Sequence, residues 1–185
     1  GQAPEDGIEI EVHPFSPNPL VVLAPRNHPL VNKKNIKLED IANEPFFMRE
    51  PGSGIRDLVF RTFDATGLRP NVRMDLGSNE VIKHAVVSGL GLSVLSLHTL
   101  TLEGVHGPVA ILDVEGFPIL RSWYIVYPKG KELSLIARTF LEFAIDYQPI
   151  FRERMQKMWP ALEAMLDNGG KKTAGRKKKK ARKKT

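Results

Sequence analysis

The segment FFMREPGSGIRDLVFRTF, residues 46–63, decides the fold class of this chain. It begins as a strand, turns at Pro-Gly-Ser-Gly, and continues with the apolar spacing of a helix that Gly67 ends. The same order returns in residues 71–87, where the alternating NVRMDL leads through Gly-Ser into NEVIKHAVV. Two strand–turn–helix units in succession are typical of α/β folds.

Further strands are expected on both sides of these two units. Continuous apolar runs at residues 20–24 and 92–97 predict buried strands, and residues 109–114 and 122–127 predict two more. The alternation of strands with helices predicts an α/β fold with a largely parallel sheet. In such sheets, ligands bind beyond the carboxyl ends of the strands.

The C-terminal part combines aromatic side chains with two helical patterns. Residues 133–147 and 150–166 predict two separate amphipathic helices. We expect Trp123, Tyr124 and Tyr127 to lie in the core, because they belong to one of the predicted strands.

The charge of the chain is concentrated at its C-terminal end. The net charge is +6, from 27 basic and 21 acidic residues, but residues 171–185 hold ten basic residues and no acid. Without these ten, residues 1–170 have 17 basic against 21 acidic residues, a net charge of −4. We expect residues 169–185 to be a disordered basic tail that either contacts nucleic acid or only keeps the chain soluble.

The amino-acid composition excludes several kinds of site and partner. The chain has no cysteine, which excludes disulfides and thiolate metal sites and fits a cytoplasmic location. No apolar run reaches the roughly 18 residues of a membrane span, so we expect no membrane partner.

The first candidate binding site is the turn that contains Ser53, Gly54 and Arg56. Free N–H groups and the helix dipole favour an anion at the start of a helix, Ser53 can donate a hydrogen bond, and Arg56 can pair with charge. The alternative is that Ser53 only caps the helix.

The second candidate site is Ser78 and Asn79, which again follow a strand and begin a helix. A simple N-cap is the alternative here too. Because two such helix starts on one side of one sheet would face the same crevice, the pair indicates a binding site more strongly than either alone.

Motifs of catalysis and of cofactor binding are missing from the sequence. The glycines of SGLGLS, residues 88–93, lack the third glycine of a dinucleotide fingerprint and follow a helix, so we expect them to reverse the chain. There is no Gly-x-Ser-x-Gly elbow, and the five histidines are scattered. We therefore expect no catalytic residue, no metal site and no cofactor, and a protein that is not an enzyme.

Five stretches, taken in order, resemble the LysR-type transcriptional regulators. The resemblance covers roughly residues 1–150 and is closest to the branch that controls Calvin-cycle (RuBisCO) operons. The stretches are APRNHPL (24–30), LEDI with PFF (38–47), EPGSGI (50–55), SNE (78–80) and VSGLGLSVLS (87–96).

The resemblance implies an effector-binding domain with the fold of type II periplasmic binding proteins. Two Rossmann-like subdomains would be joined by crossing strands near residues 18–25 and 121–128, with the first subdomain incomplete. Its remnant would be residues 1–19 and 123–150, and the second subdomain residues 20–122. A C-terminal helix at 150–168 and the basic tail would follow.

The resemblance also implies partners. The effector would be a small anionic metabolite, such as a sugar phosphate, phosphoenolpyruvate or NADPH, bound in the cleft between subdomains with Gln2 at its edge. Family members self-associate as dimers through their regulatory domains, and they bind DNA through a helix-turn-helix domain that does not precede Gly1 here. The apolar faces at residues 123–127 and 133–143 are expected to lack partners and to drive association.

Three other functions remain open at this stage. A periplasmic-type solute-binding protein would need a signal peptide and a complete first subdomain. A small hydrolase or transferase would need a nucleophile paired with a base. A nucleic-acid-binding protein would act through the basic tail.

Overall fold

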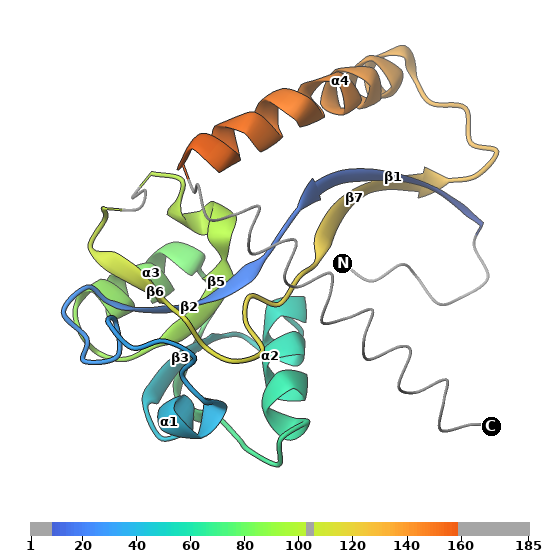
Figure 1. Ribbon diagram of the computed structural model, residues 1–185. Coiled ribbons are helices and arrows are strands. Elements are labelled where there is room, and N and C mark those ends of the chain that lie inside the picture. Colours follow the sequence, from blue (N-terminus) through green and yellow to red (C-terminus); the bar gives the residue numbers. More distant parts are fainter. Residues whose placement is uncertain (1–8, 103–105, 159–185) are drawn as a thin grey trace, which may run out of the picture.

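The computed structural model describes residues 9–102 and 106–158, and it consists of an α/β body from which an arm projects (Figure 1). The body holds β2 (Leu20–Pro25), α1 (Leu38–Ala42), β3 (Pro45–Arg49), α2 (Gly54–Asp64), β4 (Asn71–Leu76), α3 (Asn79–Val87), β5 (Ser93–Ser96), the 3-10 helix η1 (Leu97–Leu100) and β6 (Val109–Leu112). The arm holds β1 (Ile10–Pro17), β7 (Ser122–Pro128) and α4 (Leu135–Met158).

The sheet of the body is mixed. β3 and β4 are parallel, and a parallel bridge between Phe46 and Leu92 joins β3 to the residue before β5. β2, however, runs antiparallel to both of its neighbours, β5 and β6. The prediction of a largely parallel sheet was therefore wrong for β2, because this strand enters directly from β1 and no crossover helix fixes its direction.

Strand β2 lies at the centre of the body, and all six of its residues are buried. Its side chains alternate between two hydrophobic clusters, with Leu20 and Val22 in one and Val21 and Leu23 in the other. The first cluster includes side chains of α1 and α2, and the second includes side chains of α3 and α4. Helices thus cover both faces of the sheet, which is why β2 reads as a continuous apolar run.

The arm is an antiparallel β1–β7 ribbon covered by α4, as Figure 1 shows. Leu141 and Ala144 of α4 are buried against it, and Gln148 donates a hydrogen bond to the carbonyl of Pro14. α4 continues as one helix through Pro149 to Met158, so the predicted break near residue 150 was wrong. Proline removes one intrahelical hydrogen bond, and on this exposed helix the freed carbonyl of Ile145 can be hydrated.

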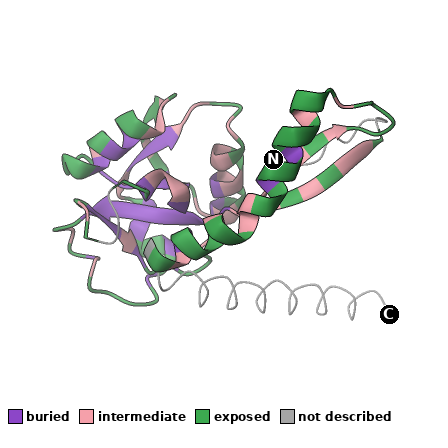
Figure 2. Ribbon diagram, turned by 90° about the horizontal axis from the view of Figure 1, so that it is seen from above, coloured by how far each residue is buried: buried purple, intermediate pink, exposed green. Residues whose placement is uncertain are grey.

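Much of the arm is exposed, as Figure 2 shows. Tyr124 is 48% exposed, and Trp123 and Tyr127 are half-buried, so the prediction of a core position for these three side chains was wrong. Among the described residues, the ribbon consists of two strands that project from the body, and α4 covers one of its faces, so the other face has no described element to pack against.

The arm and the body meet at two crossing segments, residues 17–20 and 119–122. The amide of Asn18 donates to the carbonyl of Arg121 at 2.6 Å, and Leu20 and Ile119 exchange backbone hydrogen bonds of 2.9 and 3.0 Å. The crossings lie at the starts of β2 and β7, as the predicted fold requires. Within the described ranges, no helix is long and apolar enough to cross a membrane.

Candidate functional site

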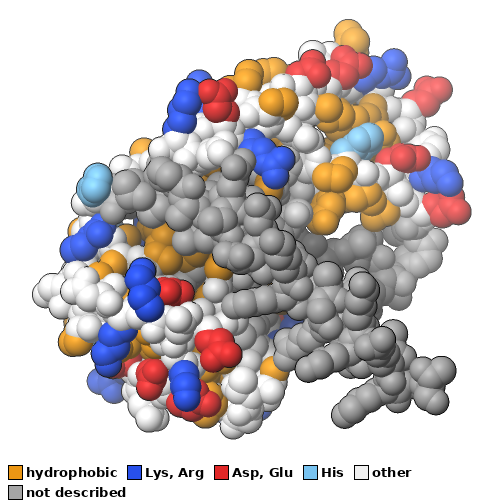
Figure 3. All heavy atoms as spheres, viewed as in Figure 1, with side chains coloured by type: hydrophobic (Ala, Val, Ile, Leu, Met, Phe, Trp, Pro, Cys, Tyr) orange, Lys and Arg blue, Asp and Glu red, His pale blue; other side chains and the backbone are white. Residues whose placement is uncertain are grey.

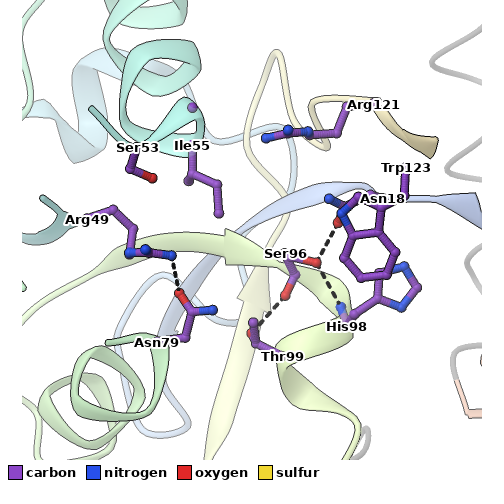
Figure 4. A pocket seen from close by; sticks show the side chains of 11 residues that line it. Asn18, Arg49, Ser53, Ile55, Asn79, Ser96, His98, Thr99, Arg121 and Trp123 are labelled. Atoms are coloured by element: carbon purple, nitrogen blue, oxygen red, sulfur yellow. Dashed lines mark hydrogen bonds between the residues drawn. The ribbon is translucent and has the colours of Figure 1, made fainter. Parts of the chain in front are cut away.

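A pocket of about 460 Å³ lies where the arm meets the body (Figure 4). Its walls come from the β3–α2 turn, the start of α3, the end of β5 with η1, and both crossing segments. The lining residues are Asn18, Arg49, Ser53, Gly54, Ile55, Asn79, Ser96, His98, Thr99, Arg121 and Trp123.

One wall is the beginning of α2. Ser53 occupies the N-cap position, but its side chain makes no capping hydrogen bond, so its hydroxyl is available to the pocket that it lines. The first N–H groups of a helix have no partner within the helix, and the helix dipole makes this end positive. Ser53 and Gly54 therefore present hydrogen-bond donors of the kind that an anion binds.

Arg49 and Asn79 form the neighbouring wall. The guanidinium of Arg49 donates to both carboxylate oxygens of Glu50, at 2.7 and 2.8 Å, and to Oδ1 of Asn79 at 2.9 Å. The hydrogen bond from Arg49 lowers the pKa of Glu50 to about 2, so Glu50 stays ionised and balances the charge of Arg49. The hydrogen bond between Arg49 and Asn79 also connects the end of β3 to the start of α3.

Two predicted site residues lie outside the pocket lining. Oγ of Ser78 accepts a hydrogen bond from the amide of Val81 at 3.5 Å, which is the capping role weighed as its alternative. Arg56 pairs with Asp75 and donates to the carbonyl of Arg49 at 2.9 Å. Gln2 lies outside the described residues. The structure therefore brings Ser53, Gly54 and Asn79 together in one pocket and gives Ser78 and Arg56 supporting contacts.

The opposite wall contains residues that the sequence reading missed. Asn18 is 3% exposed and Ser96 is 5% exposed, and Oγ of Ser96 donates to Oδ1 of Asn18 at 2.5 Å. The same Oγ accepts from the amide of His98 at 3.2 Å, and Thr99 donates to the carbonyl of Ser96 at 2.7 Å. This network fixes the end of β5 against the first crossing segment.

His98 is held by aromatic neighbours. Its ring stacks on Trp123 and on Phe151, with centroid distances of 4.5 and 5.3 Å, and its Nε2 lies 2.8 Å from the carbonyl of Pro17. Nδ1 is buried and has no partner among the described residues. Burial lowers the pKa of His98, although the contact with Pro17 acts in the opposite direction, and so His98 is neutral at pH 7.

The electrostatic character of the pocket is one-sided. Arg49 and Arg121 line it, and none of the described lining residues is an aspartate or glutamate. Glu50 is bound to Arg49, and Glu80 pairs with Lys83 at 3.0 Å, so these two carboxylates face other partners. In the described part of the chain, no group of three His, Asp or Glu residues is placed to hold a metal ion. The pocket is therefore suited to a small anion.

Comparison with known proteins places the chain in a family. Residues 1–149 match the LysR substrate binding domain. The HTH-type transcriptional activator CmpR of Synechocystis is 53% identical over 140 residues, which are 76% of this chain and 46% of CmpR. The RuBisCO operon transcriptional regulator of Allochromatium vinosum is 48% identical over 143 residues, 77% of this chain and 47% of that protein. The chain thus spans about half the length of these relatives.

Solved structures agree with this assignment. The regulatory domain of CcmR from Synechocystis PCC6803, in complex with 2-PG, is 46% identical with a TM-score of 0.74, over 80% of this chain and 70% of that one. The effector-binding domain of QuiR in complex with shikimate is 25% identical with a TM-score of 0.63, over 76% of this chain and 66% of that one. These neighbours confirm the α/β fold of the type II periplasmic-binding class. The chain belongs to the LysR substrate-binding domain family, in the branch of the Calvin-cycle regulators.

Proposed function

We propose that this chain is the effector-sensing domain of a LysR-type transcriptional regulator of carbon-fixation genes, and that it binds a small anionic metabolite. The observation that carries the proposal is the pocket between arm and body, because two arginines and none of the described carboxylates line it. Cationic side chains and helix N–H groups that converge on one cavity favour a carboxylate or phosphate ligand.

The relatives support the regulatory part of this proposal. CmpR and the RuBisCO operon regulators are named as transcriptional regulators, and the regulatory domain of CcmR was solved with a small molecule bound. These relatives favour the sensor over a solute-binding protein or an enzyme. In the longer protein, a helix-turn-helix domain would contact the DNA.

The effector contacts that we propose come from several elements around the pocket. Ser53 and Gly54 would donate to an acidic group, while Asn79 would hold Arg49 toward it. Ser78 and Arg56 would act indirectly, by fixing the start of α3 and the β3–α2 turn. We keep Gln2 as a proposed contact at the edge of the cleft.

The two crossing segments would transmit effector binding from the pocket to the arm. An effector shifts an equilibrium between arrangements only when it binds one of them more tightly. Because the pocket walls belong both to the body and to the crossing segments, an effector in it would favour one position of the arm. In a dimeric regulator, that position would set the spacing of the DNA-binding domains.

The basic tail, residues 171–185, is a proposed nucleic-acid contact. Its ten basic residues would bind phosphates without sequence preference, and this binding would weaken steeply with salt. Deletion after Gly170 should leave the effector affinity unchanged and reduce only DNA binding at low salt. Loss of effector binding on deletion would show that the tail takes part in sensing.

Isothermal titration of the chain with 2-PG, phosphoenolpyruvate and NADPH tests the proposed site. Ser53→Ala should weaken the binding of the effector about 2- to 10-fold, as expected for one lost hydrogen bond. Ser88→Ala is the matched control, because Ser88 is exposed and lies outside the pocket lining. Equal affinities of these two variants would exclude Ser53 from the site.

A further inference from the structure

Helix α4 carries a stripe of buried and half-buried side chains along one face. The stripe recurs every three or four residues, as one face of a helix requires, and consists of Leu141, Ala144, Gln148, Phe151 and Met155. At its C-terminal end, Met155 is 4% exposed. The same face of α4 is therefore in contact with other elements on both sides of Pro149.

The two halves of this stripe contact different parts of the molecule. Before Pro149, α4 packs on the ribbon of the arm, where Gln148 donates to the carbonyl of Pro14. After Pro149, Met155 belongs to the second hydrophobic cluster of the body, together with Val21 of β2 and Leu97 of η1. α4 therefore spans the junction between arm and body, as Figure 1 shows.

Phe151 lies at this junction and contacts both parts. Its ring centroid is 5.8 Å from that of Phe15 on β1 of the arm and 5.3 Å from that of His98 on η1 of the body. His98 in turn stacks on Trp123 of β7, and both of these residues line the pocket. A change in the position of the arm on the body would therefore break at least one of the ring contacts of Phe151.

Pro149 divides the half of α4 on the arm from the half on the body. Proline removes the hydrogen bond that the carbonyl of Ile145 would accept, so the helix is weakened at this boundary. Helix ends can unfold locally while the rest of a helix stays in place. The match to the LysR substrate binding domain also ends at residue 149. Residues 150–158 can therefore leave the body while the preceding part of α4 stays on the ribbon.

We propose that residues 150–158 of α4 form a strap that holds the arm in one position on the body. Removal of Phe151 and Met155 from water favours the docked strap. While the strap is docked, it also supports the pocket wall that His98 and Trp123 form. Once it is released, only the two crossing segments restrain the arm. The strap acts on the position of the arm whatever the pocket binds, and it therefore goes beyond the proposed function.

The test measures the position of the arm on the body without any ligand. Because the chain has no cysteine, two spin labels can be placed at chosen positions. Glu39→Cys on α1 marks the body and Arg138→Cys on α4 marks the arm, and both positions are exposed. Double electron–electron resonance on the full chain then gives the distribution of distances between the labels. This distribution should be narrow and have one maximum.

Met155→Glu, added to the labelled chain, should broaden the distribution or shift its maximum, because it buries a charge where the strap docks. Ile150→Glu is the matched control. It introduces the same charge into the same half of α4, at a position that is 46% exposed on the opposite face, and should leave the distribution unchanged.

Circular dichroism establishes that each variant is folded. If Met155→Glu does not fold, Phe151→Ala replaces it and should also broaden the distribution, because the contacts with Phe15 and His98 are lost. Identical distributions in the folded strap variant and in Ile150→Glu would overturn the strap. A broad distribution in the labelled chain before any further substitution would overturn it as well.

Discussion

The imidazole of His98 stacks on the indole of Trp123, with ring centroids 4.5 Å apart and ring planes 25° apart. Phe151 of α4 also stacks on His98, and Phe15 of β1 lies 5.8 Å from Phe151. His98 and Trp123 line the pocket, whereas Phe151 belongs to the helix that covers the arm. An aromatic chain therefore connects the pocket wall to α4.

Loss of the aromatic contacts made by Phe151 should destabilise the fold. Phe151 is half-buried and packs on the second hydrophobic cluster beside the buried Met155. Phe151→Ala should lower the free energy of unfolding by about 1–3 kcal/mol, measured by urea denaturation. Ile150→Ala, at a position that is 46% exposed on the same helix, should change it by less than about 0.5 kcal/mol. Similar values for both variants would show that α4 is not anchored through Phe151.

Stability should depend on pH through His98. Burial lowers the pKa of His98 below its ordinary value of 6.5, so the unfolded chain binds this proton more tightly than the folded one. The contribution of neutral His98 is therefore fully present above pH 6.5 and is lost as the pH falls below it.

The measurement is the slope of the free energy of unfolding plotted against pH, between pH 7.5 and 5.5. His98→Gln should flatten this slope relative to that of the wild-type chain. An unchanged slope in His98→Gln would mean that His98 titrates normally in the folded chain.

Gly91 is required by a close approach of two backbone segments. A Cβ at this position would overlap the carbonyl of Pro45, which accepts a hydrogen bond from the amide of Leu92 at 2.8 Å. Gly91→Ala should therefore lower the free energy of unfolding by about 2 kcal/mol or more. Gly77→Ala, where a Cβ meets nothing within 4 Å, should have a much smaller effect in the same denaturation experiment. A tolerated Gly91→Ala would contradict the pairing of β3 with the segment before β5.

The apolar surface of the arm predicts self-association. Hydrophobic side chains gather on the arm in Figure 3, and on α4 Leu135, Ile136, Phe140 and Phe143 are 60–83% exposed. Patches of this kind drive association in water. Sedimentation velocity should show concentration-dependent association, which the double variant Ile136→Glu/Phe140→Glu reduces. A wild-type chain that stays monomeric at high concentration would contradict this prediction.

The sequence allowed much of the fold to be predicted, because local signals specify it. The glycine turns and helix starts at Ser53 and Ser78 are local features of the sequence. In the structure, α2 begins after Ser53 and α3 begins after Ser78. The direction of β2 could not be predicted from its own residues. An apolar run is the same in either direction, and the direction here follows from the entry of the chain from the arm.

The binding pocket was predicted only in part, for a similar reason. Ser53, Gly54 and Asn79 come from strand–helix turns, which pattern analysis can recognise. Asn18 and Arg121 are about a hundred residues apart, and only the crossing of their segments brings them together. The sequence contained one indication of these two pocket residues, because each lies at the start of a segment that was predicted to cross between the subdomains.

The measurement that tests the account most directly is a thermal-shift screen of this chain. The panel contains phosphorylated sugars, carboxylates and nicotinamide dinucleotides, together with neutral and cationic compounds of similar size. We expect anionic metabolites to raise the melting temperature, and to raise it further as their concentration increases, because a ligand that binds only the folded state stabilises it. Stabilisation by neutral or cationic compounds alone would contradict the proposal that this pocket senses an anionic effector.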